Sequence, residues 1–68
     1  MNEEHFNLEV RKFLKKVGIT SQREIEKAVN KAITSGKIQG NETLRASIVL
    51  EIPEVKLHTE IVDEIPLE

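Results

Sequence analysis

The chain has 68 residues, with ten Lys or Arg and twelve Asp or Glu, and a formal net charge of −2. It has no cysteine and two histidines, which excludes a disulfide framework and thiolate chemistry and leaves no usual ligand set for structural zinc. A chain this short buries only about 60% of the surface that its unfolded form exposes. We therefore expect added stability from a partner, with a second copy of the chain as the first candidate.

Charge and hydropathy along the chain bear on its location and partners. No apolar run reaches the roughly 20 residues of a membrane span, and residues 1–4 lack the features of a signal peptide, so we expect a cytoplasmic protein and no membrane partner. Residues 1–40 hold eight basic and five acidic residues, a balance of +3, whereas residues 41–68 hold two and seven, a balance of −5. These parts can attract each other within the fold or across a dimer, or present separate surfaces.

A first helix is predicted over residues 3–17. Apolar residues recur there at helical spacing and form one stripe: Phe6, Val10, Phe13, Leu14 and Val17. Asn2 is suited to cap the helix start, because its side chain can accept a backbone N–H bond. Gly18 is expected to end the helix, because glycine readily adopts the left-handed conformation of a helix stop.

A second helix is predicted over residues 22–35. Its apolar stripe consists of Ile25, Ala28, Val29, Ala32 and Ile33. Ser21 and Glu24 have the spacing of a capping box, and Gly36 is expected to end this helix. The short connection at 18–20 then predicts two neighbouring helices in a helical hairpin.

Beyond residue 42 the apolar period changes from helical to alternating. Leu44, Ala46, Ile48, Leu50 and Ile52 alternate with mostly polar residues, which predicts a strand over 43–52. A reversal at Pro53 and Glu54 leads to a second strand over 55–65.

The turn position sets the expected pairing of the two strands. A reversal centred between Pro53 and Glu54 pairs Leu50 with Leu57 and places the apolar residues of both strands on one face. The predicted fold is α+β: one small domain over residues 1–68, in which an N-terminal helical hairpin packs on a C-terminal two-stranded antiparallel β-hairpin.

The chain also resembles a known family. The string FLKKVGITSQREIEKAV at residues 13–29, together with Gly36-Lys37 and the GNETL segment at 40–44, is similar to a family of small bacterial proteins classed as a domain of unknown function. The resemblance spans nearly the whole chain. It implies a bacterial cytoplasmic protein of this length and supplies no activity, cofactor or catalytic residue.

Catalysis finds no support in the sequence. Asp63 and Glu64 are adjacent in a strand and point to opposite faces, while His58 and Glu60 share the solvated face of the hairpin. No glycine-rich phosphate loop or activated nucleophile is apparent, and so small a domain lacks room for a lined cleft. We expect no enzyme and no catalytic, metal or cofactor-binding residues.

The residues left over point to a protein-interaction surface. Basic side chains cluster on the first helix with little acidic compensation: Arg11, Lys12, Lys15 and Lys16. Leu8 lies beside them and off the apolar stripe, while Val49 and Val62 lie on the outer face of the hairpin. We expect a non-enzymatic interaction module that self-associates through a hairpin edge, or through Leu8 and the outer valines.

An alternative function is a small nucleic-acid-binding regulator of the winged helix-turn-helix type. Residues 22–35 would then enter the major groove and expose polar and basic side chains: Gln22, Arg23, Lys27, Asn30 and Lys31. Glu24 and Glu26 interrupt this basic face, and the acidic chain lacks the strong basic footprint of nucleic-acid binders.

Overall fold

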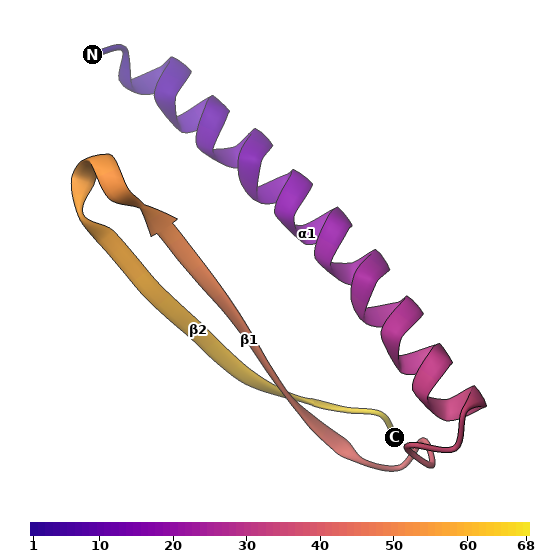
Figure 1. The fold of residues 1–68 in the computed structure, drawn as a ribbon. Helices are drawn as coiled ribbons and strands as arrows, with labels where there is room; N and C mark the ends of the chain where they lie inside the picture. The colour runs from indigo at the N-terminus through magenta and orange to yellow at the C-terminus, as the bar shows by residue number, and fades with distance from the viewer. The chain divides into compact units, whose positions relative to one another are not determined.

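The computed structural model describes residues 1–68 and contains one long helix followed by one β-hairpin (Figure 1). Helix α1 spans Glu3–Thr34, strand β1 spans Thr43–Ile52, the 3-10 turn η1 spans Pro53–Val55, and strand β2 spans Leu57–Pro66. The chain forms two compact units, Met1–Ser35 and Gly36–Glu68. The predicted α+β class and its antiparallel hairpin are confirmed.

Both ends of α1 follow from local chemistry. The side chain of Asn2 accepts a hydrogen bond from the backbone N–H of His5 at 3.0 Å, which confirms the predicted cap. At the other end the Ser35 N–H donates to the Lys31 carbonyl at 3.0 Å. Gly36 follows with a φ of 80°, a left-handed conformation in which the helix cannot continue.

The predicted helical hairpin is wrong, because α1 continues without interruption through Gly18, Ile19, Thr20 and Ser21 (Figure 1). Gly18 has no positive φ, and Ser21 lies inside the helix rather than capping a new one. An interior glycine costs only about 1 kcal/mol relative to alanine. A break at Gly18 would lose the backbone hydrogen bonds of a full helical turn. That loss is larger than the cost of an interior glycine and larger than the gain from a capping box at Ser21 and Glu24.

The two strands pair in a register two residues from the predicted one. Ile52 lies opposite Leu57, Leu50 opposite Thr59 and Ile48 opposite Ile61. The predicted pairing of Leu50 with Leu57 is therefore wrong, but a shift by two residues preserves which side chains share a face. Most apolar residues of β1 and β2 accordingly gather on one face, as expected, while Val49 and Val62 lie on the other.

The loop explains this shift. It runs from Pro53 to Lys56, so the reversal is centred one residue later than expected and β2 begins at Leu57 rather than residue 55. Lys56 adopts a left-handed conformation with a φ of 56° and donates its N–H to the Pro53 carbonyl at 3.0 Å. A lysine is not the residue that signals such a conformation, which glycine or asparagine usually adopts.

The connector before β1 is fixed by Glu42. Its carboxylate accepts the backbone N–H groups of Gln39 at 2.7 Å and Gly40 at 2.9 Å. These two hydrogen bonds favour the ionised carboxylate and lower the pKa of Glu42 below its ordinary value. The Glu42 carbonyl also accepts the Leu67 N–H at 2.9 Å, which extends the strand ladder by one pair.

Neither unit closes a hydrophobic core. No residue of the chain is buried, and fifteen large apolar side chains are 37% to 94% exposed. The apolar stripe of α1 and the apolar face of the hairpin are therefore the main features that a binding surface can use.

Candidate interaction surfaces

The basic cluster predicted on the first helix lies on exposed α1. Lys12 is the one member with an ion pair, to Glu9 at 3.5 Å, and Nε2 of His5 lies 3.8 Å from the same carboxylate. Arg11, Lys15 and Lys16 have no carboxylate within 4 Å. The cluster therefore keeps a net positive charge that Glu9 compensates only in part.

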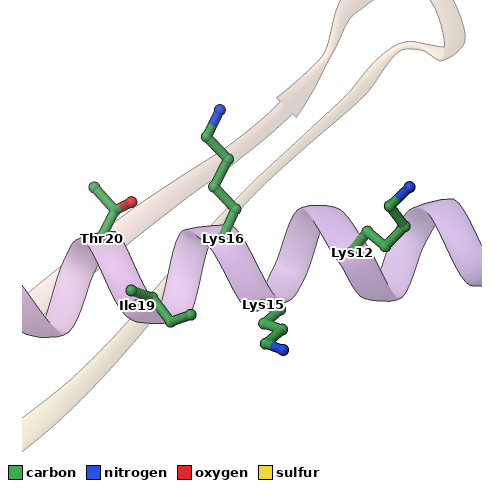
Figure 2. Close-up of a pocket in the computed structure, with 5 residues that line it drawn as sticks. All are labelled: Lys12, Lys15, Lys16, Ile19 and Thr20. Carbon is green, nitrogen blue, oxygen red and sulfur yellow. The ribbon is translucent and has the colours of Figure 1, made fainter.

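One more apolar residue lies within this basic surface. Ile19, which was expected to follow a helix end, is 51% exposed and lies close to Lys12, Lys15, Lys16 and Thr20. Figure 2 shows these five side chains leaving a single stretch of α1, with Lys15 and Lys16 pointing to different sides. All five come from one helix, so they form an open surface rather than an enclosed cleft.

Leu8 and Ile19 are related by eleven residues, which is close to three full helical turns, so both lie on the same side of α1. Each is 51% exposed. The predicted Leu8 site thus has a second exposed apolar residue on the same side of α1, about 16 Å along the helix axis. The signal that could have revealed Ile19 is this spacing, which has meaning only in an uninterrupted helix.

The outer face of the hairpin contains the two predicted valines. Val49 lies opposite Glu60 and Val62 opposite Ser47, so the valines are diagonal neighbours, 54% and 43% exposed. Nδ1 of His58 lies 3.1 Å from the Glu51 carboxylate on the same face. Leu8 belongs to the helical unit and the valines to the hairpin unit.

The inner face of the hairpin is the larger apolar surface. Three cross-strand pairs are apolar on both sides: Leu44 with Ile65, Ile48 with Ile61, and Ile52 with Leu57. Asp63, opposite Ala46, is the one charged residue on this face. Ile48 and Ile61 are 44% and 57% exposed, so water reaches the middle of the face.

Both edges of the hairpin are open, because the sheet has only two strands. The Leu67 N–H donates to the Glu42 carbonyl, so residues 42 and 67 form a hydrogen-bonded pair. In an antiparallel ladder such pairs alternate with pairs whose N–H groups point away from the partner strand. Odd-numbered residues of β1 and even-numbered residues of β2 therefore direct their N–H groups outward. Val49 and Val62 are both at such positions.

A continuous apolar seam runs along α1 because the helix is not broken at Gly18. Its positions follow steps of four, four and three residues, an 11-residue period, and we call them the seam: Phe6, Val10, Leu14, Val17, Ser21, Ile25, Ala28 and Ala32. Eleven residues make almost three turns, so the seam keeps to one side of the helix. Sequence reasoning divided it into two stripes because it placed a helix end at Gly18.

The residues of the nucleic-acid alternative all lie on α1, without the second helix and turn of a helix-turn-helix. Gln22 Nε2 donates to Glu26 at 3.3 Å. Arg23, Lys27, Asn30 and Lys31 are exposed, and no carboxylate lies within 4 Å of Arg23, Lys27 or Lys31. The structure therefore does not provide the docking geometry on which this alternative depended.

No three His, Cys, Asp or Glu side chains are grouped as metal ligands would be. α1 is long, but its charged residues leave it too polar to cross a bilayer.

The fold and surfaces define a small α+β protein made of a helix and a β-hairpin. The chain belongs to a family of unknown function, DUF6494, whose family model matches residues 1–68. This confirms the resemblance found in the sequence. No curated protein and no solved structure matches the chain.

Proposed function

We propose that the protein is a non-enzymatic interaction module that self-associates through an edge of its hairpin. Two hairpins joined edge to edge make a four-stranded sheet, and Leu8, Val49 and Val62 are then available for further protein contacts. On α1, the basic residues Arg11, Lys12, Lys15 and Lys16 form the electrostatic part of the contact surface that includes Leu8.

The absence of a buried core carries this proposal. Neither unit buries a residue, although the stability of a helix and of a β-hairpin depends on packing against other elements. Most helical stability in proteins comes from packing of an apolar face, and an isolated two-stranded hairpin is at best marginally stable in water. A second copy supplies the missing contacts without requiring any other partner.

The hairpin edge is the surface best suited to pairing. Each strand presents a row of unpaired N–H and C=O groups along ten residues, and such edges pair readily with another strand. Pro66, which has no N–H, is at an outward position near the end of β2, whereas the centre of each edge is unobstructed.

Proline substitution at the two outward valines tests the proposal. Val49→Pro removes an outward N–H from β1 and Val62→Pro removes one from β2, while neither position donates to the hairpin's own ladder. In a symmetric pair both copies use the same edge, so each variant is the matched control for the other. We expect sedimentation equilibrium to show an oligomer for the unmodified protein, and weaker association for one proline variant.

Two results would contradict the proposal. A chain that sediments as a monomer at high protein concentration does not self-associate. An oligomer that neither proline variant weakens does not use a hairpin edge. Circular dichroism of both variants at high protein concentration, where the weakened variant still associates, checks that the helix and hairpin form. The nucleic-acid alternative has no corresponding observation in its favour and is not proposed.

A further inference from the structure

We propose that the seam of α1 binds the seam of a second copy, with the two helices antiparallel. This inference rests on the proposed self-association and deepens it by naming a second contact between the copies. The occupant of the seam is thus the same helix of another chain.

The continuity of the seam is the first argument. From Phe6 to Ala32 it contains no charged side chain, and Ser21 is its one polar member. An 11-residue apolar period is the pattern of helices that pair along their length with right-handed supercoiling. A helix that needed only a short contact would not keep this period over about seven turns.

The apolar area is the second argument. Five side chains on or beside the seam, Phe6, Val10, Phe13, Leu14 and Ile25, are each 37% to 52% exposed. With about 200 Å² for an aromatic side chain and less for Val, Leu and Ile, they leave at most about 450 Å² of surface in water per helix. Two helices then bury up to about 900 Å², which reaches the roughly 1,000 Å² of a specific interface once an edge contact is added.

Side-chain volume determines the direction. The N-terminal half of the seam is bulky, with Phe6, Val10 and Leu14, whereas its C-terminal part is small, with Ala28 and Ala32. An antiparallel pair sets Phe6 opposite Ala32 and Val10 opposite Ala28, so large residues meet small ones along the interface. A parallel pair would place Phe6 against Phe6 and leave the alanines too far apart to pack.

Cysteine cross-linking tests this arrangement cleanly, because the chain has no cysteine of its own. We would mix the single variants Val10→Cys and Ala28→Cys, oxidise them mildly and identify the disulfide-linked species. We expect the mixed 10–28 species and no 10–10 species. In the antiparallel pair the two copies of residue 10 lie about 27 Å apart, because eighteen residues separate positions 10 and 28 at 1.5 Å each.

A matched pair of isoleucines gives an independent measurement. Ile25 in the seam is 39% exposed and Ile33 outside the seam is 41% exposed. Ile25→Gln removes two isoleucines from each pair of helices, so we expect the dissociation constant to rise about 100-fold or more, against little change for Ile33→Gln. Cross-linking needs neither variant, so it decides the arrangement even if Ile25→Gln fails to fold.

The outcomes separate this inference from the proposed function. Three results would each overturn the helix pairing. They are a 10–10 disulfide, equal effects of the two glutamine variants, and a monomer in which the hairpin covers the seam. An oligomer that weakens with an edge proline but forms no 10–28 disulfide leaves the edge proposal standing and overturns the seam alone. A monomer at all concentrations overturns both.

Discussion

Lys56 shows how a single residue sets the geometry of a whole hairpin. It is the one non-glycine residue with a positive φ, and its left-handed conformation closes the four-residue loop from Pro53 to Lys56. That conformation costs an ordinary residue roughly 1 kcal/mol, whereas glycine adopts it freely. The loop therefore stores strain, and the side chain at this position is exposed rather than packed.

We expect Lys56→Gly to stabilise the protein by about 0.5 kcal/mol, because relief of the left-handed strain exceeds the extra freedom that glycine gains in the unfolded chain. Urea unfolding measures the change in the free energy of unfolding. Glu54→Gly is the control, because Glu54 lies in the same loop without a positive φ and should gain nothing from glycine. A loss of stability in Lys56→Gly would mean that the lysine side chain stabilises the loop.

The loop also explains why the register was predicted two residues away. The alternation of apolar residues in β1 fixed the strand bounds of 43–52 and the composition of both faces. It did not fix which residues face each other, because a shift of two residues leaves the faces unchanged. The choice between these registers depends on the loop, and its decisive conformation is at a lysine that gives no glycine-like signal.

Among the elements, α1 is where sequence reasoning and structure differ most. The expected apolar stripes, the Asn2 cap and the Gly36 stop are all present, but the break at Gly18 is not. Glycine and a capping box mark possible helix ends, and neither forces one when helical residues continue on both sides. Leu8 and the basic residues are exposed, as predicted. The continuous seam was not predicted, because a helix end at Gly18 would divide it.

Gly18→Ala tests the continuity of α1. A Cβ at Gly18 meets nothing within 4 Å, and alanine favours an interior helix position by about 1 kcal/mol, so we expect a gain in stability of that size. A Cβ at Gly36 also meets nothing within 4 Å, but its φ is +80°. Gly36→Ala should therefore lose about 1 kcal/mol.

These two variants differ in backbone conformation and not in available space, so the pair isolates the helical state of each residue. Thermal unfolding followed by circular dichroism gives both changes. A loss of stability in Gly18→Ala matching that in Gly36→Ala would indicate that the helix ends at Gly18 in solution, as the sequence alone suggested.

In the molecule as a whole, each of the two units has an exposed apolar surface and no buried core. The helical unit carries a charge balance of +2 and the hairpin unit one of −4, so attraction between them favours assembly over separation. Neither unit has the packing to remain folded by itself. Folding and self-association are therefore expected to be one process.

If so, the melting temperature depends on protein concentration. A tenfold increase in concentration favours a folded dimer by about 1.4 kcal/mol, which for two 68-residue chains corresponds to a rise of about 5 °C. The helical signal in circular dichroism and the strand signal in infrared spectroscopy should melt together, because loss of the partner removes the support of both units. A melting temperature that stays constant over a hundredfold range of concentration would contradict coupled folding and assembly. Separate transitions for helix and strand would show instead that each unit has its own source of stability.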